Sequence, residues 1–441
     1  MNYYSTNRKA PFASLQKAVV KGLAEDKGLY MPQCIKPLPQ SFFDNIQDLS
    51  FQEIAYQVAD CFFGEDVEAD ALRKIVYDTL SFDVPLVKVS VPKEGKQKGD
   101  IFSLELFHGP TLAFKDVGAR FMARLLRYFS PDVSGGNVNV LVATSGDTGS
   151  AVANGFLGVE GVHVYVLYPK GKVSPIQECQ FTTLGQNITA LEVDGVFDDC
   201  QALVKSAFMD KELNAHMQLT SANSINVARF LPQSFYYFYA YAQLKKLGLA
   251  DNVVACVPSG NFGNICSALF GKRMGLPINR FIAANNENDI FCYYLQTGSY
   301  APRDSVQTIA NAMDVGNPSN FVRILDLYNR SHAAICADVS GASYSDEEIA
   351  STMRECLRET GYQLDPHGAC GYCALREGLR EGEVGFFLET AHPAKFKQVV
   401  DEICGTDIEI PARLQAFMRG EKRSVPMSKN FASFKAYLLQ Q

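Results

Sequence analysis

The feature that most restricts the fold is a repeated order of segments: a short apolar run, a loop that contains glycine, and then a helical stretch. This order occurs in VNVLVATSGDTGSAVANGF, in VHVYVLYPKGKVSPIQECQF and in NVVACVPSGNFGNICSALF. Apolar, β-branched runs that alternate with helical segments are typical of parallel β-sheets, whose crossover helices cover both faces. RFIAANN and VGFFLE add two further candidate strands. The sequence therefore predicts an α/β fold built on parallel sheets.

The first ninety or so residues have a different pattern. FASLQKAVVKGLAEDKGLYMP and FQEIAYQVADCFFG have the spacing of helices, and no strand–loop–helix order is visible there. The charged, turn-rich PKEGKQK follows them and marks a boundary with the alternating part of the chain. We expect a mainly helical N-terminal region over residues 1–95.

Charge and composition exclude several classes of function. The 441 residues include 41 Lys and Arg against 48 Asp and Glu, a net charge of −7, whereas a general binder of nucleic acid or anionic membranes has a basic surface. No apolar run approaches the ~18 residues of a membrane span. The start, MNYYSTNRKAPF, lacks the regions of a signal peptide, and the 12 cysteines are scattered. We expect a cytoplasmic protein with reduced thiols, which binds neither nucleic acid nor membrane.

Residues 259–264, SGNFGN, form a loop suited to an anion. They follow the apolar run VVACV and precede the helical stretch ICSALFGK. Small residues let the backbone approach a ligand closely, and the first turn of a helix offers unpaired N–H groups to a phosphate. An ordinary tight turn between strand and helix is the other interpretation. Neither the Walker A nor the G-x-G-x-x-G spacing is present, which weakens a nucleotide interpretation.

A second loop, ATSGDTGSA at residues 143–151, has the same position between a strand and a helix. Its hydroxyl groups and exposed backbone amides suit the carboxylate or phosphate of a small ligand. Asp147 is the exception, because a carboxylate repels an anion unless it faces away. Alternatively, Asp147 and Thr148 cap the next helix.

Lys115 lies in an apolar setting, HGPTLAFKD. A lysine stem often lies along apolar surface with its amine in water, and this is one interpretation. The two anion-binding loops favour another, in which the amine forms a Schiff base with pyridoxal phosphate whose phosphate is held at a helix N-terminus.

Five segments together resemble one enzyme family. LFHGPTLAFKDVGARF, ATSGDTGSA, SANSINVAR, VPSGNFGN and TAHPAKF are similar to segments of the threonine synthases of the longer bacterial and fungal type. These enzymes belong to the fold-type II pyridoxal-phosphate group, which includes the β subunit of tryptophan synthase. The similarity runs from PFASLQKAVVKGLAEDKGLYMP to TAHPAKF, nearly the whole chain.

The resemblance implies roles for particular residues. Lys115 carries the pyridoxal 5'-phosphate and acts as the catalytic base. Thr390 hydrogen-bonds the pyridine nitrogen, and a hydroxyl there does not force that nitrogen to be protonated. The phosphate of the cofactor is expected on Gly260, Asn261, Phe262, Gly263 and Asn264.

The substrate is expected between the second loop and a further segment. By resemblance, Thr144, Ser145, Thr148 and Gly149 bind its carboxylate. Asp147 stands where shorter relatives have an Asn that contacts the phenolic oxygen of the cofactor, so its role stays open. Asn223, Ser224 and Arg229 are suited to a second phosphate, since a guanidinium matches phosphate oxygens; a structural salt bridge of Arg229 is the alternative.

The resemblance implies a reaction and a domain plan. The expected enzyme is a carbon–oxygen lyase acting on phosphates, which converts O-phospho-L-homoserine and water to L-threonine and phosphate. A phospholyase or dehydratase acting on another amino acid is the alternative. A large cofactor-binding α/β domain is expected over residues 96–124 and 236–441, and a small α/β domain over residues 125–235. We expect a monomer or a homodimer.

Other features have weaker claims to a function. Lys172 is a candidate for the second phosphate or a solvated loop lysine. His367, Cys370 and Cys373 have short spacings, but a structural zinc site needs four ligands and no partner pair is visible, so we expect no metal.

Overall fold

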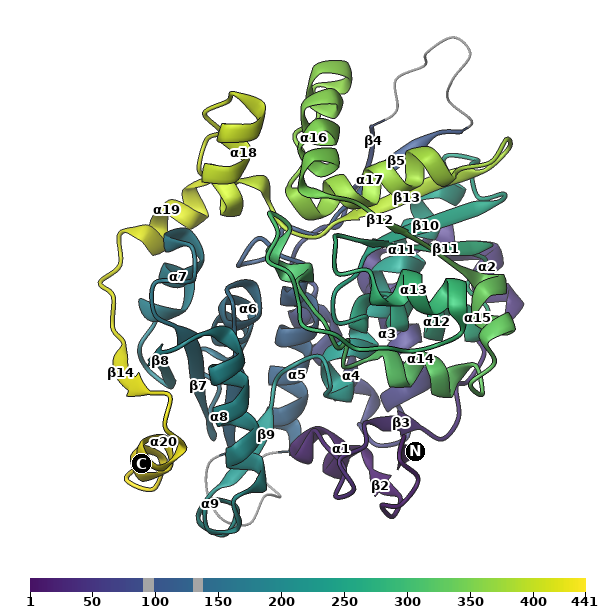
Figure 1. The fold of residues 1–441 in the computed structure, drawn as a ribbon. Helices are drawn as coiled ribbons and strands as arrows, with labels where there is room; N and C mark the ends of the chain where they lie inside the picture. Colours follow the sequence, from purple (N-terminus) through teal and green to yellow (C-terminus); the bar gives the residue numbers. More distant parts are fainter. Residues whose placement is uncertain (90–98, 130–137) are drawn as a thin grey trace.

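The computed structural model describes residues 1–89, 99–129 and 138–441, and Figure 1 shows their arrangement. PKEGKQK, where the N-terminal region is predicted to end, lies outside the described residues. The described chain forms three sheets, two of which are large and mainly parallel, with helices around them. The predicted α/β fold with parallel-sheet domains is confirmed.

The N-terminal region is mainly helical, as predicted, and also holds a small sheet that the sequence pattern did not indicate. The strands of this sheet are antiparallel and short, so they carry too few alternating residues to be recognised. They are β2 (Ala13–Ser14), β1 (Asn2–Ser5) and β3 (Tyr30–Pro32), in that order. The helices are α1 (Leu15–Lys21), α2 (Gln40–Asn45), α3 (Phe51–Phe63) and α4 (Ala69–Thr79).

The larger sheet has six strands, all parallel except the edge strand β4, which is antiparallel to β5. All six residues of β10 are buried, which is typical of a parallel strand covered on both faces. The order across the sheet is β12 (Val339–Ser343), β11 (Arg280–Asn285), β10 (Val253–Pro258), β13 (Val384–Glu389), β5 (Ile101–Glu105) and β4 (Leu86–Lys88).

The smaller sheet has five parallel strands. Alternate residues of its strand Val138–Ala143 face opposite layers: Val140 and Val142 pack toward α5 and α6, whereas Leu141 packs toward α8. The order is β14 (Val425–Ser428), β8 (Ile188–Asp194), β7 (Val162–Pro169), β6 (Val138–Ala143) and β9 (Gln218–Ser221). The C-terminal β14 thus joins this sheet, although residues 236–441 are predicted as part of the large domain.

Helix α5 (Lys115–Phe129) lies between the two large sheets (Figure 1). Its apolar residues Val117, Phe121, Leu125 and Phe129 are all buried, as their shared helical face predicts. The helices with the smaller sheet are α6 (Asp147–Phe156), α7 (Pro175–Thr182), α8 (Phe197–Met209), α9 (Lys211–His216), α19 (Ala412–Met418) and α20 (Phe431–Leu438).

The remaining helices surround the larger sheet. A single apolar core runs from the N-terminal region through α5 to this sheet, so the three parts of the chain are packed against one another. The helices are α10 (Val227–Phe230), α11 (Phe235–Lys246), α12 (Gly263–Arg273), α13 (Ile290–Thr297), α14 (Phe321–Leu327), α15 (His332–Asp338), α16 (Asp346–Thr360), α17 (Pro366–Gly378) and α18 (Lys397–Cys404).

Candidate active site

Lys115 and Thr390 lie beyond the carboxyl ends of two neighbouring strands, β5 and β13, where parallel sheets bind their ligands. The backbone joins the two segments: the amide of Phe114 donates to the carbonyl of Thr390 at 2.8 Å, and that of His392 donates to Leu112 at 3.0 Å. Leu112 has φ of 58°, a strained conformation that these contacts hold in place. The predicted Schiff-base lysine and the predicted pyridine partner are therefore brought together.

Several charges act on the amine of Lys115, which is the first residue of α5. Burial lowers its pKa, and the negative charge of Asp147 opposes that shift. The positive charges of Lys395 and Arg229 lower the pKa further. A lowered pKa increases the fraction of neutral amine, the form that acts as nucleophile and base.

The loop SGNFGN connects β10 to α12, so the first turn of α12 presents its backbone amides at the end of the sheet. Added side-chain atoms would crowd it: a Cβ on Gly260 would come within 2.9 Å of the carbonyl oxygen of Ala312, and one on Gly263 within 3.2 Å of Ser224. Phe262 has φ of 62° and is buried. The loop is thus a close-packed turn at a helix N-terminus, with the geometry of a phosphate site.

Asn264 has a buried side chain that is bound on one side only. Its Oδ1 accepts hydrogen bonds from the hydroxyls of Tyr236 at 2.7 Å and Tyr237 at 2.6 Å. Its Nδ2 is buried and has no partner among the described residues. A buried donor without a partner is costly, so this amide favours a ligand at the loop.

The second loop joins β6 to α6, as predicted. The hydroxyl of Thr144 accepts hydrogen bonds from the amides of Gly146 at 2.9 Å and Gly149 at 2.8 Å, so these groups shape the loop. Ser145 is exposed and Thr148 half-buried. The alternative interpretation, that Asp147 and Thr148 cap the helix, is wrong: α6 begins at Asp147 itself, and Gly146 is the N-cap without a side-chain hydrogen bond.

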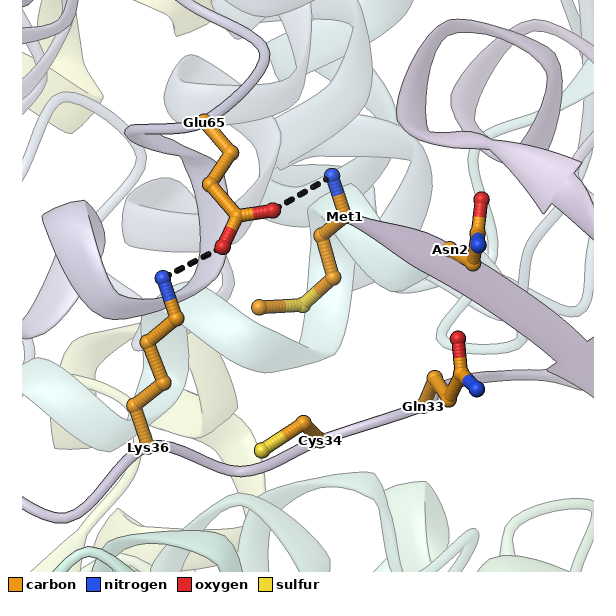
Figure 2. Close-up of a pocket in the computed structure, with 6 residues that line it drawn as sticks. All are labelled: Met1, Asn2, Gln33, Cys34, Lys36 and Glu65. Carbon is orange, nitrogen blue, oxygen red and sulfur yellow. Dashed lines mark ion pairs between the residues drawn. The ribbon is translucent and has the colours of Figure 1, made fainter.

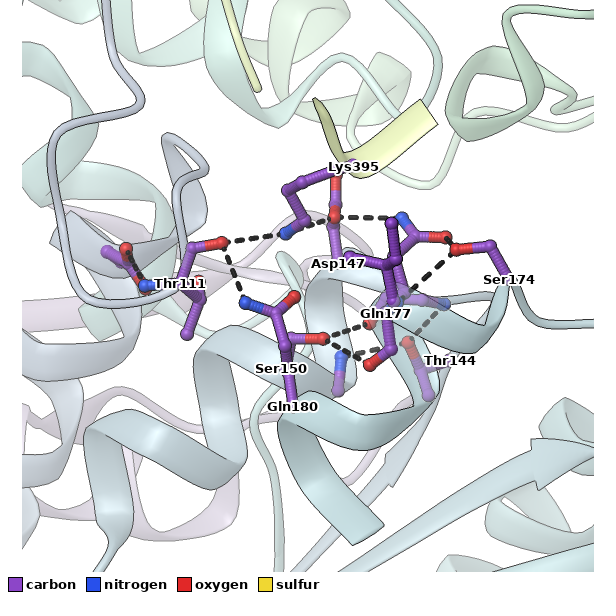
Figure 3. A network of polar contacts seen from close by, with 12 residues as sticks. Thr111, Thr144, Asp147, Ser150, Ser174, Gln177, Gln180 and Lys395 are labelled. Atoms are coloured by element: carbon purple, nitrogen blue, oxygen red, sulfur yellow. Dashed lines mark hydrogen bonds and ion pairs between the residues drawn. The ribbon is translucent and has the colours of Figure 1, made fainter. Parts of the chain in front are cut away.

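Asp147 is paired with a lysine that the sequence interpretation gave no role. Its Oδ1 lies 2.6 Å from Nζ of Lys395 and 2.9 Å from Nε2 of Gln177 (Figure 3). Burial raises the pKa of the Asp147 carboxyl, but the charges of Lys395 and Lys115 outweigh that effect and hold the pKa below its ordinary value. The carboxylate is therefore charged and neutralised locally, which removes its conflict with an anion in this loop.

Arg229 lies in the short helix α10 and is 2% exposed. Its Nε and Nη1 have no hydrogen-bond partner among the described residues, which also offer it no ion pair. The alternative interpretation, a structural salt bridge of Arg229, is therefore not found among the residues that the structure describes. Burial lowers the pKa of Arg229 to about 10. Burying a guanidinium without an acceptor is costly, so this group favours an anionic ligand.

The neighbours of Arg229 in the sequence are held in a defined loop. Ser224 Oγ accepts a hydrogen bond from Nδ2 of Asn320 at 3.0 Å, and Oδ1 of Asn223 accepts one from Ser221 at 3.3 Å. Arg323 is fully buried beneath this loop and donates to the carbonyl of Ser224. Asn320 and Arg323 had no recognisable motif, so sequence reasoning missed them.

The weaker candidates have structural explanations. Lys172 is exposed in a loop. His367 accepts a hydrogen bond from the amide of Ala312 at 3.1 Å, so its other ring nitrogen carries the proton that is shared with Asp365 at 2.9 Å. Cys370 and Cys373 are buried, and burial raises the pKa of both thiols. The described residues contain no cluster of three or more His, Cys, Asp or Glu suited to a metal.

These groups fit pyridoxal phosphate and a second anion. The amine of Lys115, with its lowered pKa, suits the reactive carbon of the cofactor, and the hydroxyl of Thr390 suits the ring nitrogen. The first turn of α12, with the unpartnered amide of Asn264, suits the cofactor phosphate. Arg229 remains for a further anionic group.

The pocket in Figure 2 lies elsewhere, at the N-terminus. Its volume is about 260 Å³, and Lys36 and the N-terminal amine there are both paired with Glu65. These three charged groups on the pocket wall are paired with one another, so none of them is left to bind a ligand. The pocket is lined by none of the predicted site residues.

Comparison with known proteins gives one consistent result. Residues 80–389 match the family described as pyridoxal-phosphate dependent enzyme, residues 2–80 match the threonine synthase N terminus, and residues 368–438 match the threonine synthase C-terminal region. Among curated relatives, the threonine synthase of Haemophilus influenzae is 42% identical over 440 residues and covers 100% of both chains. That of Saccharomyces cerevisiae is 37% identical and covers 90% of this chain and 88% of its own.

Solved structures agree with the sequence matches. The threonine synthase of Escherichia coli superimposes with a TM-score of 0.91 at 40% identity, covering 100% of both chains. The PLP-bound threonine synthase of Brucella melitensis has a TM-score of 0.91 at 35% identity, covering 100% of this chain and 99% of its own. No helix of the described residues is both long enough and apolar enough to cross a membrane.

Proposed function

The chain belongs to the threonine synthase family of pyridoxal-phosphate-dependent lyases, and from this premise we propose that its substrate is O-phospho-L-homoserine. The products are then L-threonine and inorganic phosphate. The observation that carries the proposal is the buried guanidinium of Arg229, which has no acceptor among the described residues. Its positive charge also lowers the pKa of Lys115, so the two groups belong to one site. A substrate with a phosphate supplies the acceptor that this group requires.

We propose that Lys115 performs the proton transfers. When bound, pyridoxal phosphate supplies an electron sink that stabilises negative charge at the carbon next to the amino group. The freed amine of Lys115 takes the proton from this carbon and later returns one. Its pKa is lowered by burial, so more of the amine is neutral than in an exposed lysine, and the neutral form is the one that accepts a proton.

The other residues bind and orient. The amides of Gly263 and Asn264 at the start of α12 are positioned for the cofactor phosphate, and Thr390 for the ring nitrogen. Ser145 and Thr148 are suited to the substrate carboxylate, with Thr144 and Gly149 shaping that loop. Asn223 and Ser224 are suited to hydrogen-bond the substrate phosphate, and the charge of Arg229 neutralises the phosphate as it leaves. Water is added at the neighbouring carbon.

The rival reactions differ in their use of phosphate and in their product. A dehydratase has no substrate phosphate, so it leaves the Arg229 guanidinium without an acceptor. A phospholyase uses that site but releases a keto acid instead of threonine. The full-length similarity to threonine synthases also does not favour either alternative.

Purified protein with Lys115→Ala tests the assignment. Wild-type protein is expected to show the absorption band of the Schiff base and to form threonine and phosphate in equal amounts from O-phospho-L-homoserine. The variant is expected to lose the band, and its kcat is expected to fall by at least about 10⁴-fold because nucleophile and base are removed together. Phosphate release without threonine would show a phospholyase, and a wild-type protein without the band would refute the cofactor lysine.

We also propose the cellular setting and the domain division. All 12 cysteines are free, which supports a reducing compartment such as the cytoplasm. The two large sheets support a large domain and a small domain that enclose the site, preceded by residues 1–95. A monomer or homodimer remains our expectation for the assembly.

A further inference from the structure

The ion pair between Asp147 and Lys395 joins two parts of the molecule that belong to different sheets. Asp147 is the first residue of α6, which follows strand β6 of the five-stranded sheet. Lys395 lies in the 3₁₀ helix Pro393–Phe396, which follows β13 of the six-stranded sheet. Their side chains are 6% and 0% exposed and are 2.6 Å apart. The pair is thus buried at the junction of the two domains.

The carbonyl of Thr111 completes this junction (Figure 3). It accepts hydrogen bonds from Nζ of Lys395 at 2.8 Å and from Nε2 of Gln180 in α7 at 3.1 Å. The amide and hydroxyl of Thr111 donate to Asp116 at 2.8 and 2.6 Å. Lys115 lies between Thr111 and Asp116 in the chain, so the segment that carries it is fixed from both domains.

A buried ion pair is a poor way to gain stability. Removing two charges from water costs several kcal/mol for each ion, and apolar side chains of similar size often stabilise a protein equally well. The pair is useful for geometry instead, because an uncompensated charge in the interior is so unfavourable that one arrangement is strongly preferred. Gln177 donates a hydrogen bond to Asp147 as well, which further restricts the position of the carboxylate.

We propose that Asp147 and Lys395 are a pair of positioning residues that hold the substrate loop of the small domain against the Lys115 segment. The proposal rests on the function proposed above, since it assigns both loops to one site. It explains how a carboxylate is tolerated within an anion-binding loop: Lys395 neutralises it. It also gives the pair an electrostatic role, because Asp147 and Lys395 act on Lys115 with opposite signs.

The test compares Lys395→Met, Asp147→Asn and the variant with both substitutions. Each single substitution leaves one buried group without its partner, and we expect kcat/KM to fall about a hundredfold, as for a misplacement of about 1 Å at a reacting centre. The double variant lacks both charges of the pair, so its midpoint of urea unfolding is expected to recover toward the wild type. Its kcat/KM is expected to stay low, because the link between the loops is still missing.

A second readout does not depend on catalysis. Amide hydrogen exchange of the segments 109–116 and 144–150 in protein stripped of cofactor is expected to be at least about tenfold faster in all three variants than in the wild type. Lys397→Met is the matched control, because Lys397 also pairs with an aspartate at 2.6 Å, but within one domain and 24% exposed. Its kcat/KM and the exchange of both segments are expected to stay at wild-type values.

Two results overturn the proposal. One is a double variant that regains activity together with stability, which would make the pair a structural element only. The other is unchanged exchange of both segments in the variants. If the single variants do not fold, the double variant decides. A wild-type protein that forms no threonine refutes the proposed function instead, and the exchange experiment still tests the link between the loops.

Discussion

Two buried arginines show how a structural group differs from a binding group. Arg323 is fully buried and donates to the carbonyls of Tyr30 and Ile225, to that of Ser224 and to Oδ1 of Asn320. Arg229 is equally buried, but two of its nitrogens have no acceptor among the described residues. Burial lowers the pKa of Arg323 to about 9 and that of Arg229 to about 10. The two residues share their chemistry and burial, so the difference in partners indicates a difference in role.

Substitution by methionine is expected to separate the two roles. Arg323→Met leaves several carbonyls without donors and is expected to lower the free energy of unfolding by about 3 kcal/mol or more. Arg229→Met removes an uncompensated charge, so the free energy of unfolding without ligands is expected to stay the same or to rise by about 1 kcal/mol or more. Its kcat/KM for the phosphorylated substrate is expected to fall about 10²- to 10³-fold. Urea unfolding and phosphate release measure both quantities, and a destabilised Arg229→Met would contradict the binding role.

Glu389, the buried last residue of β13, makes the stability of the protein depend on pH. Burial and the charge of Asp365 raise the pKa of its carboxyl well above the ordinary 4.5. The folded protein then holds a proton that the unfolded chain releases, so this contribution to stability is present below pH 4.5 and is lost as the pH rises through the raised pKa. Glu389→Gln keeps an acceptor for the amide of Asp365, at 2.7 Å in the wild type, without titrating.

We expect the unfolding free energy of Glu389→Gln to depend less on pH between pH 5 and 9 than that of the wild type. The measurement is a series of urea unfolding curves across that range. Glu347→Gln is the control, because the side chain of Glu347 is 90% exposed, and its curves are expected to follow the wild type. Equal slopes for Glu389→Gln and the wild type would show that Glu389 is ionised in the folded protein.

At the scale of elements, helix α5 sets the position of the reacting amine because Lys115 is its first residue. The helix is held closely on two sides by glycines. A Cβ on Gly118 would collide with the carbonyl oxygen of Arg229 in α10, and one on Gly155 in α6 would come within 3.0 Å of the carbonyl carbon of Ala119. The contacts therefore fix α5 relative to both Arg229 and the segment Asp147–Phe156, which carry the proposed phosphate and substrate contacts.

Gly118→Ala is expected to reduce both stability and activity, although alanine forms helices better than glycine by about 1 kcal/mol. The backbone carbonyl of Arg229 must move, so we expect a loss of about 1–3 kcal/mol in unfolding free energy, as for overpacking, and a fall in kcat/KM. Gly378→Ala at the end of α17 is the matched control. The added carbon there meets only the side-chain end of Ile282, at 2.9 Å, and is expected to cost much less. Equal effects in the two variants would refute the role of the close contact.

The sequence was informative about elements and less informative about partners. The central strands were predictable because apolar runs such as VVACV stand directly before glycine-containing loops, and Lys115 and Thr390 followed from a family resemblance. Lys395 lies within TAHPAKF, but nothing in that segment alone shows that its amine meets Asp147, 248 positions away. The edge strands β12 and β14 are short and partly exposed, so their residues carry little apolar pattern.

At the scale of the whole molecule, the C-terminal segment returns from the large sheet to the small one (Figure 1). After α18 and α19, strand β14 pairs with β8, and α20 packs beside α8. Met427, Phe434 and Leu438 are buried in the apolar cluster of that sheet. The segment therefore covers the edge and part of one face of the sheet that carries the substrate loop.

Removal of residues 421–441 is expected to destabilise the protein strongly. Three large apolar side chains would no longer be buried, each contributing about 1.5–3 kcal/mol, and the edge of β8 would be open to pairing with other chains. We expect a lower unfolding temperature and concentration-dependent aggregation, measured by circular dichroism and light scattering. Removal of residues 440–441, which are exposed, is the control and is expected to have no effect. A stable, monodisperse truncated protein would show that the segment is dispensable.

The place of β13 in the six-stranded sheet has a consequence for synthesis on the ribosome. β13 lies between β10 and β5, and Thr390 follows it directly, yet it is translated after both of these strands. Glu389 is translated 274 residues after Lys115. At a synthesis rate of ~5–20 residues per second, this takes roughly 15 to 55 seconds. Once β10 has also been made, β5 and β10 each have an open edge until β13 pairs with both, and such edges favour pairing with other chains. The last central strand to be translated completes the site.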